Sequence, residues 1–127
     1  MQIEFRGKTL ELNDPGPEIV TAFAKWMSRE SQVMFLLTNR YMEFKNGTVQ
    51  LPANAKLGAA YDSFLDEYED RLGKYLSRIR EFLGKAGMPE NECDALLKMP
   101  DGLTGIMELV MESLKVISVP GDILKNS

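Results

Sequence analysis

Apolar and polar residues alternate through the first 13 residues of the chain, and the alternation is interrupted once, around Gly7. The apolar members of this pattern are Ile3, Phe5, Leu10 and Leu12. A period of two places every second side chain on one face of a strand, and glycine tolerates the positive φ of a tight turn. The pattern therefore predicts a half-buried β-hairpin over residues 1–13.

The spacing of apolar residues becomes helical after Pro15 and Pro17. Neither proline has an N–H group to donate within a sheet, and Asp14 is suited to capping the first turn of a helix. Beyond them, apolar residues recur at intervals of three, four or seven, at Ile19, Phe23, Trp26, Val33, Leu37 and Tyr41. This stripe predicts a helix over residues 17–39. The segment 28–31 is polar on all sides, which leaves open a division of the helix into two.

Residues 41–51 carry the signal of a second hairpin. The dipeptide Asn46-Gly47 is the one most compatible with a type I′ turn, and short runs with strand character flank it. The pattern predicts two short strands joined by this turn. A competing interpretation keeps Tyr41 to Lys45 helical and makes Asn46-Gly47 the C-terminal cap of the preceding helix.

The clearest periodicity in the chain predicts a long helix over residues 54–85. Its apolar positions follow alternating steps of four and three residues, at Tyr61, Leu65, Tyr68, Leu72, Tyr75, Ile79 and Phe82. Opposite charges four residues apart support the helix, in the pairs Glu67 with Arg71, Asp70 with Lys74, and Glu81 with Lys85. Gly84 and Gly87 then end it. The apolar stripe is either intramolecular core or a seam for a partner helix.

Two further helices are predicted over residues 89–99 and 103–117, with a Pro-Asp-Gly break between them. The second of them is apolar around nearly half of its circumference, which indicates burial. After another Pro-Gly break, residues 120–127 are predicted to form a loosely attached tail. The predicted fold class is α+β: a predominantly helical single domain, residues 1–127, with one or two small antiparallel β-hairpins.

The composition removes several classes of chemistry. The 127 residues include no histidine and one cysteine, Cys93. Catalysis by Ser-His-Asp or Cys-His groups, His-ligated zinc and di-iron sites of the EXXH type therefore cannot be built from this chain alone. A lone cysteine cannot form an internal disulfide and fits a reducing compartment, so a cytoplasmic location is expected. The sequence shows neither a secretory leader pattern nor an apolar run near 18 residues, so no membrane contact is expected.

The formal charge is −4, from 15 basic and 19 acidic residues, and nucleic-acid binding is therefore not expected. One hypothesis is a hydrolase or transferase in which Asp62, Asp66 or Glu69 holds a metal. The ion pairs four residues apart favour a solvated helix face instead, so neither a metal nor a cofactor is expected. Cys93 lies among acidic residues, which raise the pKa of a thiol, and this favours an inert side chain.

Eight methionines form an unusual share of the apolar residues. Thioether side chains adapt to irregular partners, although filling gaps in a core is their commoner use. Combined with the heptad stripe, this predicts a surface for a protein partner or for self-association into a homo-oligomer. Its expected residues are Tyr61, Leu65, Tyr68, Leu72, Tyr75, Met107 and Met111.

The segment Ile3 to Leu12, I-E-F-R-G-K-T-L-E-L, followed by a turn and a helix-rich remainder, resembles the tail assembly chaperones of long-tailed bacteriophages. The resemblance implies a small, non-enzymatic and often oligomeric protein of the host cytoplasm. Such proteins are thought to shield the tape measure protein while tail tube subunits assemble around it.

The chain is therefore expected to be a non-enzymatic protein-binding or assembly protein that uses apolar helix surfaces. The alternative is a small acidic phage-encoded inhibitor that binds a host enzyme or defence complex through charge complementarity. Binding through exposed charges weakens as ionic strength rises, whereas an apolar contact does not, so salt separates the two hypotheses.

Overall fold

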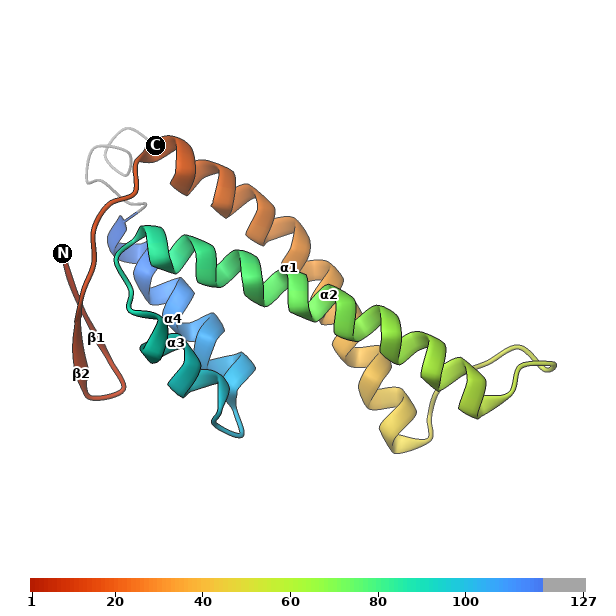
Figure 1. Ribbon diagram of the computed structural model, residues 1–127. Helices are drawn as coiled ribbons and strands as arrows, with labels where there is room; N and C mark the ends of the chain where they lie inside the picture. The colour runs from red at the N-terminus through yellow and green to blue at the C-terminus, as the bar shows by residue number, and fades with distance from the viewer. Residues whose placement is uncertain (118–127) are drawn as a thin grey trace. The chain divides into compact units, whose positions relative to one another are not determined.

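The structure is a computed structural model that describes residues 1–117 and contains, within them, four helices and one two-stranded antiparallel sheet (Figure 1). Helices account for 71% of these residues, which confirms the predominantly helical α+β fold class. The chain divides into two compact units. Unit 1 comprises Met1–Ala24 and the chain from Arg78 onward, and unit 2 comprises Lys25–Ser77. The single domain stays a prediction, and the predicted tail, residues 120–127, lies outside the described residues.

The N-terminal hairpin is confirmed as part of unit 1. Strand β1 (Gln2–Phe5) pairs antiparallel with β2 (Lys8–Glu11). Arg6 and Gly7 form the two-residue turn, with φ of 49° and 80°, the left-handed region that a type I′ turn requires. The buried side chains of β1 are Ile3 and Phe5.

Helices α3 (Glu90–Leu97) and α4 (Gly102–Ile117) confirm the two predicted C-terminal helices, with ends within two residues of those expected. In unit 1, α4 packs against both α3 and β1. A Cβ atom on Gly102 would lie 2.8 Å from the carbonyl oxygen of Leu96, so α4 begins where only glycine fits. The fully buried apolar residues of α4 are Ile106, Leu109 and Val110.

The long helix predicted over residues 54–85 is confirmed as α2 (Leu57–Lys85). It begins three residues later than expected because the preceding segment forms a turn, in which the Ala55 N–H donates to the Pro52 carbonyl at 2.9 Å. Gly87, just beyond the end of α2, has a φ of 86°, as expected for a glycine that terminates a helix.

Helix α1 (Pro17–Asn46) is continuous over 30 residues, longer than the predicted 17–39 and not divided at the polar segment 28–31. One of these polar residues finds a partner within unit 2, because Ser31 Oγ lies 3.0 Å from the hydroxyl of Tyr75. A polar segment does not interrupt a helix when its side chains find hydrogen-bond partners on a neighbouring element.

The second hairpin predicted over residues 41–51 is wrong, and the competing interpretation as a helix end is correct. Gly47 follows the last residue of α1 with a φ of 72°, the conformation of a helix C-terminal cap. The Thr48 N–H donates to the Glu43 carbonyl at 2.9 Å, which closes the last turn. The ring of Phe44, near the end of α1, packs against Tyr61 and Phe64 of α2.

Candidate protein-binding surface

Three tyrosines of the predicted binding stripe lie against α1 within unit 2. The ring centroids of these contacts are 5.3 Å apart for Tyr61 and Phe44, 5.2 Å for Tyr68 and Tyr41, and 5.4 Å for Tyr75 and Trp26. Aromatic pairs at this separation are favourable beyond the area that they bury. The stripe therefore contributes to the packing of α2 on α1, one of the two roles that the sequence leaves open.

Tyr75 is the most deeply buried of these three tyrosines, with 2% of its surface exposed. Its hydroxyl donates to the sulfur of Met27 at 3.6 Å and lies within hydrogen-bond distance of Ser31. Burial raises the pKa of this phenol, the hydrogen bond to Ser31 opposes the rise, and the nearby Glu30 adds to it. No part of Tyr75 is left for an external partner in this arrangement.

The other predicted site residues differ in exposure. Leu65 and Leu72 are half-buried on α2, in unit 2. On α4, in unit 1, Met107 is half-buried and Met111 is 51% exposed. The predicted set is thus divided between the two units, and its use by a partner stays a prediction.

A different set of apolar side chains is open to solvent on α1. Phe35 is 65% exposed, Leu36 is 67% exposed and Met42 is 48% exposed. Phe35 is nine residues from both Trp26 and Phe44, which is two and a half helical turns, so it projects from the side opposite these α2-facing rings. Sequence reasoning missed this surface, although two large apolar residues outside the helical stripe were a visible signal.

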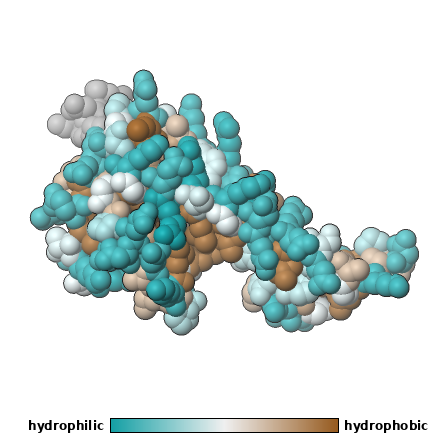
Figure 2. Space-filling view, in the orientation of Figure 1, coloured by the Kyte–Doolittle hydropathy of each residue, from teal (hydrophilic) through white to brown (hydrophobic). Residues whose placement is uncertain are grey.

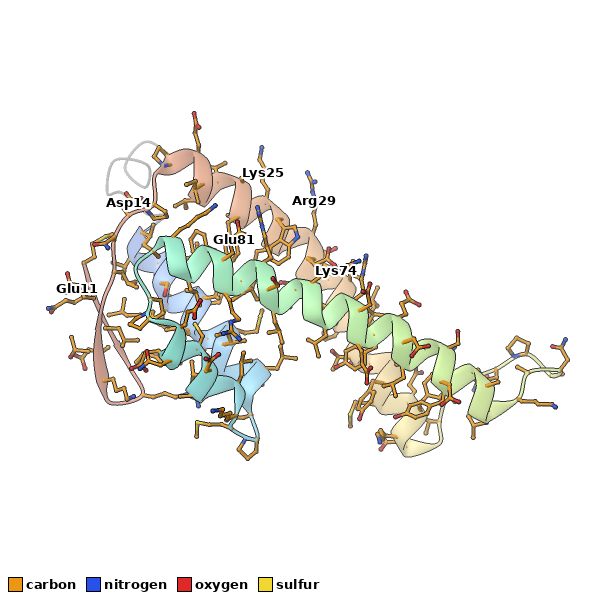
Figure 3. All side chains as sticks on the ribbon, in the orientation of Figure 1. Glu11, Asp14, Lys25, Arg29, Lys74 and Glu81 are labelled. Atoms are coloured by element: carbon orange, nitrogen blue, oxygen red, sulfur yellow. The ribbon has the colours of Figure 1, made fainter. Side chains whose placement is uncertain are left out.

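Two basic side chains lie in line with Leu36 toward the start of unit 2, each within about 20° of it around the helix. Lys25 and Arg29 are exposed and point the same way from α1 (Figure 3). Within residues 1–117 neither of them forms an ion pair with a carboxylate. We refer to the surface made by Lys25, Arg29, Phe35, Leu36 and Met42 as the α1 outer face.

An acidic surface lies on α2 of the same unit. Its exposed members are Asp62, Asp66, Glu69, Gly73 and Ser77, which we call the α2 outer face. Counting about 100° per residue, these five positions lie within about 80° of one another around the helix. The three carboxylates have no cationic partner among the described residues.

The charge pairs predicted along α2 are only partly formed. Lys74 pairs with Asp70 at 3.0 Å, as predicted, and a second expected pair forms between Lys85 and Glu81 at 3.2 Å. Arg71 does not pair with Glu67 and instead lies 3.5 Å from Glu30 of α1. The surplus negative charge of α2 therefore stays at its surface. Figure 2 shows hydrophilic and apolar surface side by side on the face turned to the viewer.

Unit 1 contains a cavity of about 230 Å³ between the hairpin and α3. Phe5, Leu10, Leu96 and Met99 contribute to its apolar lining, and Lys8 and Glu92 form an ion pair at 3.3 Å among its lining residues. Sites for small organic ligands usually exceed about 300 Å³. The cavity is large enough for one apolar side chain.

Arg6 links the turn of the hairpin to α4 and to the residue just before it. Its Nη2 atom lies 2.9 Å from a carboxylate oxygen of Asp101 and 3.3 Å from one of Glu108. These hydrogen bonds raise the pKa of Arg6, and the bond from Arg6 lowers the pKa of Asp101. Arg6 and Asp101 thus favour each other's charged form, and the interaction has a structural role.

Cys93 lies in the interior of unit 1, with 3% of its surface exposed. Burial is the main cause that raises the pKa of its thiol, Arg80 opposes the rise, and the neighbouring carboxylates add to it. A protonated and buried thiol is a poor nucleophile. Among residues 1–117, no three cysteine or acidic side chains are grouped so that they could hold a metal ion.

No helix in the described part of the chain combines the length and apolar character needed to cross a membrane. Comparisons with protein-family models, with curated proteins and with solved structures found no match to this chain.

Proposed function

We propose that this protein is a non-enzymatic binding and assembly protein that captures another polypeptide on the α1 outer face. The observation that carries the proposal is the exposure of Phe35 and Leu36, each about two-thirds open to solvent on one helix. Single exposed apolar residues are ordinary, whereas grouped large ones mark surfaces that become buried on association. Covering each of these side chains contributes about 1.5–3 kcal/mol.

The resemblance of the N-terminal hairpin to phage tail assembly chaperones gives the proposal its specific form. A chaperone of this class holds an apolar segment of another protein until assembly consumes it. The α1 outer face suits that task because it offers large exposed apolar side chains beside two cations. On this proposal the partner is an apolar polypeptide segment in the host cytoplasm.

A chemically unfolded reporter protein that aggregates on dilution provides the test, with light scattering as the readout. We expect the full chain to suppress aggregation and Phe35→Ser/Leu36→Ser to require at least about tenfold more protein for the same effect. Leu57→Ser is the matched control, because Leu57 is 57% exposed and lies outside the α1 outer face. Equal suppression by the double variant and the wild type would contradict the proposal.

A second candidate function is favoured by the acidic α2 outer face, whose Asp62, Asp66 and Glu69 are unpaired within the described residues. Such a surface fits an inhibitor that covers a basic site on another protein. Protection of the reporter that disappears as salt rises from about 50 mM to about 500 mM would favour this candidate. Protection that persists favours the apolar surface.

A further inference from the structure

We propose that the α1 outer face of one copy docks, in parallel, against the α2 outer face of a second copy. This inference goes beyond the proposed function, because it assigns to the same surface a second partner, another copy of this chain. The two surfaces differ, so every copy presents one of each. Contacts of this head-to-tail kind close into rings or extend into filaments.

Charge complementarity is the first argument. Within unit 2, the α1 segment from Lys25 to Asn46 carries four basic and two acidic residues, whereas the α2 segment from Leu57 to Ser77 carries two basic and five acidic residues. The cations Lys25 and Arg29 lie on the outside of α1 (Figure 3). Opposite potentials on two surfaces of one molecule attract copies of that molecule to each other.

The spacing of the two surfaces supplies the second argument. Lys25 and Arg29 are four residues apart, and so are Asp62 and Asp66. Residues spaced by four and then seven positions lie within about 40° of one another on a helix. Each charged pair therefore continues in a straight line to the residue seven positions later.

The residue in that line is Leu36 on α1 and Gly73 on α2. One offset of 37 positions consequently places Lys25 on Asp62, Arg29 on Asp66 and Leu36 on Gly73 at the same time. An antiparallel arrangement that preserves both charge contacts would place Leu36 opposite Ala55, which lies before the start of α2.

Gly73 supplies the third argument. Glycine in a helix interior lowers helix stability relative to alanine, so a reason for its presence is expected. Residues 1–117 give none, because a Cβ at this position would have none of their atoms within 4 Å. The missing side chain leaves a flat place on α2 where the exposed Leu36 of a second copy can approach the backbone closely.

The experiment uses two charge-reversed full-length chains, Lys25→Glu/Arg29→Glu and Asp62→Lys/Asp66→Lys. At about 100 µM protein and about 50 mM salt, where screening is weak, we expect the wild type to show at least twice the single-chain mass by chromatography with light scattering. Each variant alone is expected to show the mass of one chain. An equal mixture of the two restores assembly, because the reversed α1 face of one fits the reversed α2 face of the other.

A single-chain mass for the wild type, or a mixture that does not assemble, would overturn the proposal. All four positions are exposed, and an unchanged circular dichroism spectrum confirms that the variants fold. The chain that carries all four reversals gives a second check, since it should assemble with itself again.

Gly73→Gln tests the close approach. We expect it to raise Tm, because glutamine favours helix, and to weaken assembly at least tenfold. Gly84→Gln is the matched control, since Gly84 also lies in α2 with no atom within 4 Å of a Cβ, and it should raise Tm without affecting assembly. Unweakened assembly by Gly73→Gln would contradict the close contact.

Failure of this inference is distinguishable from failure of the proposed function. A wild type that stays a single chain, yet loses reporter protection in Phe35→Ser/Leu36→Ser, overturns only the contact between copies. A second outcome is assembly that depends on charge, with equal reporter protection by Phe35→Ser/Leu36→Ser and the wild type. It supports the contact between copies and overturns the capture of other polypeptides.

Discussion

The rings of Phe23 and Phe82 stack with their centroids 3.9 Å apart and their planes 9° from parallel. Both belong to unit 1, with 1% and 3% of their surfaces exposed. The pair joins the start of α1 to the end of α2, two segments that are far apart in the sequence. Their contact is therefore a tertiary one that the helices do not need for their own formation.

Phe82→Ala should lower the free energy of unfolding by about 3–5 kcal/mol, because it leaves a cavity beside the Phe23 ring. Urea denaturation followed by circular dichroism measures the change. Phe35→Ala removes the same side chain from a position that is 65% exposed and should cost less than about 1 kcal/mol. Similar losses from both substitutions would show that the stacked pair does not belong to the core.

Asp101→Asn should destabilise the chain at neutral pH and not in strong acid. The hydrogen bond from Arg6 lowers the pKa of Asp101 below its ordinary value of 3.8. A carboxyl group with a lowered pKa stabilises the fold above its ordinary pKa, and this contribution is lost as the pH falls through the lowered value. The stability difference between wild type and variant should therefore be constant above about pH 5 and vanish below the lowered pKa.

Urea denaturation at a series of pH values measures this difference. Adding about 1 M salt at neutral pH should reduce it, since both charges are partly exposed. A difference that grows as the pH falls would contradict the ion pair as its source.

Gly47→Ala and Gly84→Ala should have opposite effects on stability, although both glycines have open space around them. Gly47 has a φ of 72°, and alanine in that conformation costs about 1–2 kcal/mol. Gly84 lies within α2, where alanine contributes up to about 1 kcal/mol through its helix propensity. Thermal unfolding of the two variants should give Tm values on either side of the wild type. If residues 41–51 formed a second hairpin, Gly47 would not be the residue that terminates a helix.

Cys93 should resist alkylation while the chain is folded. Its thiol is buried and its pKa is raised, so both access and the thiolate fraction are low. Iodoacetamide at about pH 8 should modify the folded protein at least about a hundredfold more slowly than the protein in strong denaturant. Mass spectrometry of the intact chain follows the reaction. Equal rates in both conditions would place the thiol at the surface.

The sequence predicts those elements whose signals are local. The hairpin depends on alternation around Gly7, whose φ of 80° fits the turn, and α2 depends on heptads that need no knowledge of a neighbour. In the segment 41–51 the local signal competes with a tertiary one. Phe44 packs on two rings of α2, and this contact holds as helix a segment whose Asn-Gly dipeptide favours a hairpin.

The candidate site was less accessible to sequence reasoning. A stripe of apolar residues identifies a helix but not the element that covers it, and for Tyr61 and Tyr75 that element is α1. Phe35 and Leu36 do not belong to the stripe, so periodicity assigned them no role. Their exposure becomes evident only when the orientation of α1 toward α2 is known.

Arg6 stands near the beginning of the chain, and its partners Asp101 and Glu108 follow 95 and 102 residues later. The N-terminal strands therefore emerge from the ribosome long before α4, the helix that packs on β1, has been synthesised. Until α4 has been synthesised, β1 has an uncovered apolar side and both strands have free edges, which favour mispairing between nascent chains. On crowded polysomes this apolar side is therefore open to neighbouring nascent chains until α4 has been made.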